Sequence, residues 1–382
     1  MLSKIGIKGL YGLYSYSIDF RPDWKPYCFV TGPNAYGKTS LLRMIDRLYN
    51  QEFKELSSIH FDEFDLRFDD GFQINIIQDR IYDDDSSSDE TFPQKVVLNF
   101  TFGTYEGTLV PFVWESDAEE EGKLNNMTAY LASHPIYLIS DNRLYKGGTS
   151  ESVGQSLESC MKTYLQDLER ELNATIQQGM LEEQVPIREL YYNEKVAQLQ
   201  PYIDSILKYE LVRRNPVPVY SDEKSAFCHT CITALENALT DSVLGKIACL
   251  DALCRIIENY GFAKKHLELS PYFGFRFKAE DEMASILSFD QLSSGERHIM
   301  LMNYDILFDV KDEALVLIDE PELSFHLEWQ GQFIPNIDEI VGVRKDLQFI
   351  ICTHAPEVFG YEWGVSVDLL EQSEEGQKEA KR

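Results

Sequence analysis

The sequence is poor in cysteine: seven are scattered over 382 residues. That spacing does not fit a scaffold held together by disulfides. The start of the chain lacks the basic region and long apolar run of a signal peptide. No apolar run reaches the roughly 18 residues that a membrane-spanning helix needs. We therefore expect a cytoplasmic protein that has no membrane segment.

Positive charge is also scarce. The chain has 35 lysines and arginines against 64 aspartates and glutamates, which gives a formal net charge of −29. Such a chain on average repels the phosphate backbone of nucleic acids. The sequence contains no long basic patch, but it does not exclude a short local one. The composition therefore leaves direct nucleic-acid binding uncertain.

Apolar residues make up 44% of the chain, enough to bury a substantial core. Their spacing divides the sequence into four parts. Residues 1–150 and 266–366 carry strand-like runs, residues 151–265 show helical spacing, and the polar residues 367–382 are predicted to form a disordered tail. The sequence thus predicts an α/β head, with a mixed and parallel sheet covered by helices. An inserted helical arm, residues 151–265, would separate the two halves of this head.

A glycine-rich stretch, "GPNAYGKT", follows a predicted strand and opens a predicted helix, and it fits the phosphate-loop pattern G-x-x-x-x-G-K-[ST]. Glycines at its two fixed positions let the backbone N–H groups turn toward a phosphate, and the helix N-terminus adds partial positive charge. Lys38 is predicted to reach the β- and γ-phosphates of ATP, and Thr39 to hold Mg²⁺. The predicted nucleotide-binding residues of this loop are Gly32, Pro33, Asn34, Ala35, Tyr36, Gly37, Lys38, Thr39 and Ser40.

Two later apolar runs end in charged or titratable residues. The run "ALVLIDEPE" reaches Asp319, a predicted Mg²⁺ ligand acting through water, and then Glu320, predicted to polarise the attacking water. An acid at a buried strand end needs a cation or a water network to satisfy it. The run "LQFIICTH" ends at His354, predicted to contact the γ-phosphate or the attacking water. A purely structural role for this histidine is the alternative.

A third element, "LSSGE", opens a predicted helix with small polar residues, an arrangement that suits an anion. It resembles the signature motif of the ABC-type ATPases. The resemblance implies that Ser293, Ser294, Gly295 and Glu296 bind the ATP held by a second chain. Two sites would then form only when the heads of a homodimer face each other.

Two further stretches, "DEPELSFHLEWQ" and "THAPE", resemble the patterns of the OLD-type ATPases within the RecF/SMC/OLD group. The matches cover about residues 1–145 and 265–365. Leu327 stands where that pattern has proline, Ala355 where it has serine, and Arg297 where glutamine is common. These departures leave nucleotide binding intact in principle but favour slow turnover. Gln73 and Gln78 are the candidates for the glutamine of the Q-loop.

The OLD nucleases carry a C-terminal Toprim domain, and the 28 residues after His354 leave no room for one. The resemblance therefore extends to the ATPase subunits of bacterial anti-phage systems, such as PtuA and AriA, which work with a separate nuclease or toxin. By this analogy the chain senses or gates a separate effector. The analogy does not decide whether the homodimer assembles into a higher oligomer. The alternatives are an ATP-dependent clamp or scaffold with little turnover, and a RecF-like DNA repair ATPase.

Two further features each have more than one interpretation. Cys228 and Cys231 have C-x-x-C spacing, which supplies two of the four ligands of a structural zinc site. We favour ordinary core packing for these two cysteines. The alternative is a zinc ion shared between two chains. Arg143, after its predicted strand, is a candidate for nucleotide or DNA contact, against a surface salt bridge.

Overall fold

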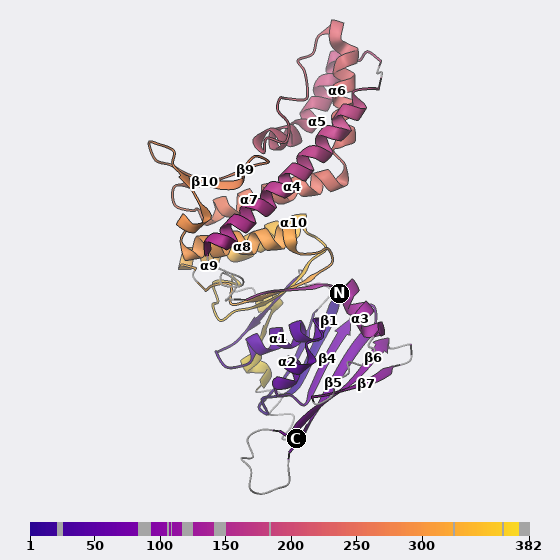
Figure 1. Ribbon diagram of the computed structural model, residues 1–382, viewed down its shortest axis with the longest axis vertical. Coiled ribbons are helices and arrows are strands. Elements are labelled where there is room, and N and C mark those ends of the chain that lie inside the picture. Colours follow the sequence, from indigo (N-terminus) through magenta and orange to yellow (C-terminus); the bar gives the residue numbers. More distant parts are fainter. Residues whose placement is uncertain are drawn as a thin grey trace. The chain divides into compact units, whose positions relative to one another are not determined.

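The structure, a computed structural model, describes most of the chain, namely residues 1–20, 26–82, 93–104, 107, 109–116, 125–140, 150–182, 185–323, 325–360 and 363–373. The chain folds into two compact units (Figure 1). The first unit comprises Met1–Asp141, Asp309–Ile334 and Lys345–Arg382, and the second unit comprises Asn142–Phe308 and Pro335–Arg344.

The first unit contains an antiparallel sheet of six strands in the order β2-β1-β4-β5-β6-β7. In β4 buried and half-buried residues alternate, as expected of a strand with one face on the core. The strands are β1 (Leu2–Leu10), β2 (Tyr14–Asp19), β4 (Glu63–Phe68), β5 (Phe72–Ile81), β6 (Lys95–Thr104) and β7 (Val110–Glu115).

A second sheet of five strands, in the order β14-β3-β13-β12-β8, is parallel throughout. Every residue of β3 and β12 is buried, which explains why these segments are continuous apolar runs in the sequence. The strands are β3 (Tyr27–Thr31), β8 (Ile136–Ile139), β12 (Leu315–Asp319), β13 (Gln348–Cys352) and β14 (Ser366–Asp368).

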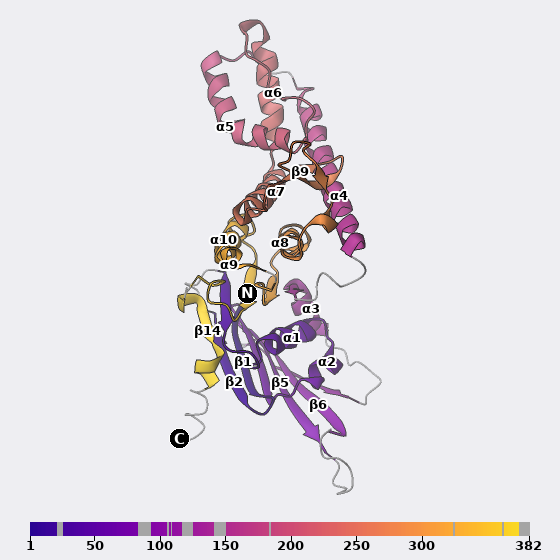
Figure 2. The same ribbon diagram turned by 90° about the vertical axis from the view of Figure 1, so that its left-hand side faces the viewer.

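Helices pack on both sheets of the first unit (Figure 2). Helix α1 (Lys38–Tyr49) contacts β8 and β12, while α2 (Phe53–Ser58) contacts β6. One face of α1 is apolar and buried, since Ile45 and its neighbours on that face are at most 1% exposed. The remaining helices are α3 (Asn125–Ser133), α9 (Leu327–Gly331), the 3₁₀ turn η5 (Trp363–Val365), and α10 (Phe333–Val343), which crosses from the first unit into the second.

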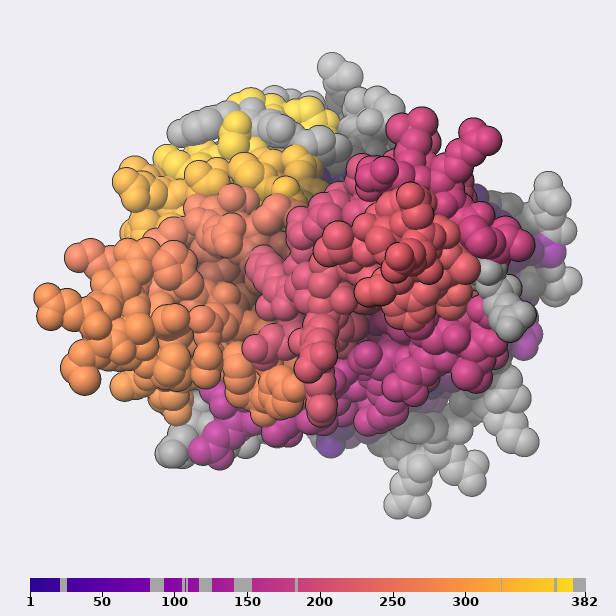
Figure 3. All heavy atoms as spheres, turned by 90° about the horizontal axis from the view of Figure 1, so that it is seen from above, coloured from indigo at the N-terminus to yellow at the C-terminus, as the bar shows by residue number. Residues whose placement is uncertain are grey.

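The second unit is built from long helices and a three-stranded antiparallel sheet, in the order β11-β10-β9. Helix α4 packs against α6 and β10. Figure 3, viewed along the helices, shows the β9–β10 region in orange beside α4 in magenta. The elements are α4 (Ser150–Gly179), α5 (Glu189–Lys208), η2 (Asp222–Lys224), α6 (Ser225–Ala238), α7 (Asp241–Tyr260), β9 (Lys265–Ser270), β10 (Gly274–Ala279), β11 (Ile286–Leu287), η3 (Phe289–Gln291), α8 (Ser294–Tyr304) and the π-helical turn η4 (Asp305–Asp309).

The predicted α/β fold class, with a parallel sheet and an inserted helical region, is confirmed. Residues 225–260 of the predicted helical arm form two helices, because the Thr240 side chain accepts a hydrogen bond from Val243 N and caps the start of α7. No helix in the described ranges is both long and apolar enough to cross a membrane.

The compact units divide the chain differently from the predicted domains. Residues 266–308, which the sequence assigns to the head, belong with the helices of the second unit. Within the predicted tail, residues 367 and 368 continue β14, which pairs with β3, so the disorder predicted from residue 367 is wrong at its start. The last residues, 374–382, lie outside the described part of the chain.

A single glycine allows the sheet of the second unit to approach α4. Gly274 has φ 81°, and a Cβ there would lie 2.2 Å from the backbone oxygen of Glu158. Neither the backbone conformation nor the space accepts a side chain. Close packing of β10 on α4 therefore requires glycine at this position.

We expect Gly274→Ala to destabilise the second unit by roughly 3 kcal/mol, through left-handed strain together with overpacking. Gly245→Ala in α7 is the matched control, because nothing lies within 4 Å of its Cβ position. That substitution should stabilise by about 0.5–1 kcal/mol, since alanine favours the helix. Urea unfolding followed by circular dichroism measures both changes, and equal effects of the two substitutions would contradict the packing argument.

Candidate nucleotide site

Three neighbouring parallel strands of the first unit deliver the predicted site residues to one edge of the sheet. β13 lies between β3 and β12, and Cys352 pairs with both Asp319 and Val30. The segments that follow these strands therefore start at the same edge. They are the phosphate loop, the acidic turn after Asp319 and the turn that contains His354. Ligands of open α/β sheets bind at the carboxyl ends of the strands in the same way.

The phosphate loop has the backbone that its glycines predict. Gly37 has φ 83° and stands immediately before α1, and its Cβ position lies 2.6 Å from Leu10 Cδ2. Gly32 has φ 136°, and Ala35 is left-handed without being glycine, at φ 72°. The hydroxyl of Tyr16 donates to the backbone oxygen of Tyr36 at 2.7 Å, which ties the loop to β2.

Lys38 is the buried cation of this loop, with 4% of its surface exposed. Its Nζ donates to the backbone oxygens of Gly32 at 2.8 Å and Pro33 at 3.2 Å. Among the residues that the structure describes, no carboxylate pairs with this ammonium group. A buried positive charge balanced only by carbonyl dipoles attracts an anion.

The residues predicted to hold Mg²⁺ lie together. The Thr39 hydroxyl donates to Asp319 Oδ1 at 3.2 Å, although 280 positions separate the two residues in the chain. Asp319 is only 9% exposed. A hydroxyl and a carboxylate beside a phosphate loop are the oxygen donors that Mg²⁺ takes, so these residues fit the ion.

Glu320 and residues of the phosphate loop line a cavity of about 500 Å³. Glu320 has a φ of 47°, a strained value for a residue with a side chain, and its N–H donates to Cys352 O at 2.9 Å. Its Oε1 lies 3.6 Å from His354 Nδ1. The structure thus brings the predicted water-activating acid and the predicted histidine together. The cavity is lined by Tyr11, Asn34, Ala35, Gly37, Lys38, Thr39, Ser40 and Glu320.

A second acid, Glu322, contacts His354 more closely than Glu320 does, with Oε1 3.1 Å from Nδ1. None of the predictions from the sequence includes Glu322. The available signal was its position in "DEPE", three residues after Asp319, in a segment otherwise leading into a buried turn. Tyr11 was also missed: its hydroxyl lies 2.7 Å from Ser40 Oγ at the rim of the cavity. Tyr11 belongs to no recognisable motif, because only the tertiary fold brings it next to the phosphate loop.

Neither candidate for the Q-loop glutamine lines this cavity. Gln78 is buried, and its amide donates to the backbone oxygens of Ser57 and Ile59, at 3.3 and 3.0 Å. Its Oε1 accepts from Arg80 Nε at 2.7 Å. Gln73 pairs with Arg67 inside the antiparallel sheet. Gln78 therefore fixes the α2–β4 connection instead of facing a nucleotide.

The signature motif lies in the second unit, at the N-terminus of α8. Ser293 is the N-cap: its Oγ accepts from Glu296 N at 3.3 Å, while Glu296 Oε2 accepts from Ser293 N at 2.8 Å. This reciprocal pair is a capping box. Ser293 and Ser294 are exposed, which leaves the first turn of α8 accessible.

Glu296 differs from the prediction that it contacts ATP. Its side chain is 5% exposed and forms an ion pair with Lys265 Nζ at 2.7 Å, in addition to the cap. Both carboxylate oxygens are therefore used inside the second unit. Glu296 supports the signature turn from behind, and this geometry does not support direct nucleotide contact.

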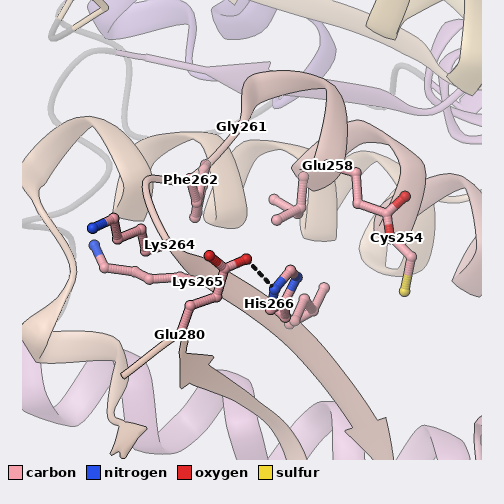
Figure 4. A pocket seen from close by; sticks show the side chains of 10 residues that line it. Cys254, Glu258, Gly261, Phe262, Lys264, Lys265, His266 and Glu280 are labelled. Carbon is pink, nitrogen blue, oxygen red and sulfur yellow. Dashed lines mark hydrogen bonds and ion pairs between the residues drawn. The ribbon is translucent and has the colours of Figure 1, made fainter. Parts of the chain in front are cut away.

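Lys265 also lines a cavity of about 280 Å³ beside the end of α7 (Figure 4). His266 and Glu280 form an ion pair there, at 2.6 Å, and Lys264 lies close by. Charges of both signs line this cavity, so it does not define a ligand of one sign. The cavity is linked to the signature motif through Lys265, which lines the cavity and also forms the ion pair with Glu296.

The C-x-x-C pair lies within α6, and Cys228 and Cys231 are 0% and 5% exposed. Burial, with a smaller contribution from Cys228, raises the pKa of the Cys231 thiol to about 11. In the described residues no group of three or more histidine, cysteine or acidic side chains is arranged to hold a metal. This burial supports the core-packing interpretation. Arg143 lies outside the described residues.

Fold and site together define a P-loop nucleotide-binding protein. Residues 115–359, more than half of the chain, match the AAA ATPase domain family. The chain therefore belongs to the AAA ATPase domain family. The matched range begins after the phosphate loop and includes both the acidic turn and His354.

The sequence is also similar to the Retron Ec83 probable ATPase of Escherichia coli, at 35% identity over 83 residues. This match covers 19% of the chain and 15% of that protein, so the chain spans only a small part of its relative.

Similar solved structures include Smc head domains. The head from Pyrococcus furiosus, bound to the C-terminal domain of ScpA, has a TM-score of 0.40 at 12% identity, covering 94% of this chain and 91% of that one. The head from Thermotoga maritima has a TM-score of 0.36 at 10% identity, with the same coverage.

We expect the Glu296 carboxylate to make the stability of the second unit depend on pH. Burial alone would raise its pKa, but the hydrogen bonds from Lys265 and Ser293 outweigh burial and lower it below 4.5. The stabilisation is therefore complete above pH 4.5 and is lost as the pH falls through the lowered pKa. Glu296→Gln should cost about 2 kcal/mol at neutral pH, a difference that shrinks in acid.

Urea unfolding across this pH range measures the effect, and Glu282→Gln is the control because Glu282 is exposed. A Glu296→Gln penalty that persists unchanged in acid would contradict the proposed ion pair.

Proposed function

We propose that this protein hydrolyses ATP as a head-to-head homodimer and gates a separate effector, a nuclease or toxin, in bacterial anti-phage defence. The observation that carries the ATPase proposal is the convergence of three strand ends. A phosphate loop with a buried lysine, the Thr39–Asp319 pair, and Glu320 beside His354 meet at one sheet edge. These are the parts that phosphoryl transfer to water requires.

Each group has a role that its position supports. Lys38, already buried in the loop, neutralises charge on the β- and γ-phosphates. Thr39 and Asp319 would hold Mg²⁺, which supplies charge neutralisation at the phosphate oxygens. Glu320 accepts a proton from water as the water oxygen bonds to the γ-phosphorus, while the bond to the β–γ bridging oxygen breaks and ADP leaves.

The dimer is proposed for the signature motif. The accessible N-terminal turn of α8, with Ser293 and Ser294 exposed, presents backbone N–H groups to an anion. In the ABC-type ATPases that the motif resembles, this anion is the γ-phosphate bound by the other subunit. Ser293, Ser294 and Gly295 would therefore complete the site of the partner chain, with Glu296 as their support.

The defence role is supported by the likeness to a retron ATPase over 83 residues, together with the sequence resemblance to ATPase subunits that act with separate effectors. The net charge of −29 favours a protein effector over direct contact with nucleic acid. A RecF-like role at DNA is the less favoured alternative on the same ground.

Lys38→Ala and Glu320→Gln are each expected to lower steady-state phosphate release at least about 100-fold, since they remove charge stabilisation and the proton acceptor. Lys38→Ala should also weaken ATP binding, whereas Glu320→Gln should retain ATP and accumulate the dimer. Phosphate release, nucleotide binding and size-exclusion chromatography measure these effects. The exposed residues Lys54 and Glu55 on α2 provide the controls Lys54→Ala and Glu55→Gln.

Unchanged turnover in both site variants would remove the ATPase assignment. ATP binding without phosphate release by the unmodified protein would favour the clamp or scaffold instead.

A mixing experiment tests whether the signature acts on the partner chain. Lys38→Ala inactivates the phosphate loop and Ser294→Arg blocks the exposed signature turn, so each variant alone should be inactive. In a mixed dimer, one site combines the intact loop of one chain with the intact signature of the other. Random pairing should then restore about a quarter of the original activity. Absence of any recovery in mixtures shown to exchange subunits would contradict completion of the site in trans.

A further inference from the structure

We propose that Glu322 is the positioning residue for His354, and that it holds this histidine so that Glu320 remains available to activate water. The inference rests on the proposed ATPase function and assigns a role to a residue that the motif comparison left without one. It follows from the contacts of a single buried carboxylate in the first unit.

One oxygen of Glu322 collects the polar groups at the end of β13. Its Oε1 accepts from the Thr353 hydroxyl at 2.7 Å and from the His354 N–H at 3.0 Å, and it lies 3.1 Å from His354 Nδ1. Thr353 Oγ1 in turn accepts from Ala355 N at 3.1 Å. The backbone N–H and the imidazole ring of His354 thus both contact the same carboxylate oxygen.

Burial makes this carboxylate costly for the fold. The Glu322 side chain is 4% exposed, and its second oxygen, Oε2, is buried without a hydrogen-bond partner. Within the described residues the one group in ion-pair range of Glu322 that can carry positive charge is His354. A buried acid with an unsatisfied oxygen costs stability, so a purely structural turn would be better served by a neutral side chain. Such a conflict between fold and local chemistry is typical of functional positions.

The two acids near His354 are not equivalent. Nδ1 is 3.1 Å from Glu322 but 3.6 Å from Glu320, and Glu320 is the more exposed of the two, at 26% against 4% for the side chains. The closer, buried carboxylate is the better acceptor for the Nδ1 proton. Glu320, which lines the nucleotide cavity, is therefore left to accept the proton of a water molecule.

The 3.1 Å contact between Nδ1 and Glu322 Oε1 favours a proton on Nδ1, and that proton also determines the chemistry of the other ring nitrogen. When the imidazole is neutral, the Nδ1 proton leaves Nε2 as an acceptor, and when it is charged, Nε2 donates. In either state the ring orientation is set by Glu322. Glu322 would act through His354, because Glu320 and not Glu322 is among the residues that line the cavity beside the phosphate loop.

Glu322→Gln tests the proposal, because the amide oxygen can still accept from Thr353 and from the His354 backbone while the negative charge is lost. We expect kcat for ATP to fall roughly tenfold to a hundredfold, with KM changed less than about twofold, as for outer-shell partners of catalytic groups. Nitrogen NMR of the His354 ring should show a loss of the Nδ1-protonated form. Glu322→Asp should recover part of kcat, and Glu55→Gln should match the original protein.

A double substitution separates positioning from a role in folding. In a His354→Ala background, Glu322→Gln should have no further effect on kcat if Glu322 acts through His354. A full additional loss there, or an original kcat and unchanged ring signals in Glu322→Gln alone, would overturn the proposal. If Glu322→Gln does not fold, the same comparison is made with Glu322→Asp, which should lower kcat in the original protein and have no further effect on kcat in the His354→Ala background.

The proposed ATPase function fails on different evidence. Unchanged phosphate release in Lys38→Ala and Glu320→Gln would reject that function, whereas a loss in those variants with no effect of Glu322→Gln rejects the positioning role alone.

Discussion

The parallel register of β3, β13 and β12 is the constraint on which the site depends. Pairing of Cys352 with both Asp319 and Val30 forces three strand ends to one edge of the sheet. Residues 280 positions apart then come within hydrogen-bond range without any long-range recognition of their own, as the Thr39–Asp319 contact shows. A shift in the register of one of these strands would move its site residue away from the others. The site therefore depends on the alignment of the sheet.

The site concentrates charge that the fold does not neutralise locally. Lys38 is buried against carbonyl oxygens, and Glu322 is buried with one oxygen unpaired. Glu320 holds a left-handed backbone that disfavours a side chain. Each of these features costs stability in isolation, and all of them lie at the carboxyl edge of one sheet. Binding of a polyanion with its metal would relieve the first of these costs, and an oriented imidazole the second.

The signature motif belongs to the second unit and does not depend on the alignment of the parallel strands. Its accessible turn is stabilised by a capping box and by the Lys265–Glu296 ion pair, both within that unit. The sequence also contains a local pattern that predicts the capping role of Glu296. Ser293 and Glu296 have the S-x-x-E spacing of a capping box, and that local pattern explains the glutamate better than the family resemblance does. In the structure both carboxylate oxygens of Glu296 are used within the second unit, by Lys265 and by the cap.

Local chemistry was determined by the sequence alone. The phosphate loop, the apolar face of α1 and the buried runs that became β3, β12 and β13 all depend on residues within one short segment, and the fold class followed from them. Only the tertiary structure decided which acid meets His354, that Tyr11 reaches Ser40, and that Gln78 fixes a turn instead of facing the nucleotide cavity. Each of these contacts joins segments whose separation in the chain carries no periodic signal. Their pairing is set by strand order and side-chain packing, which one sequence does not reveal.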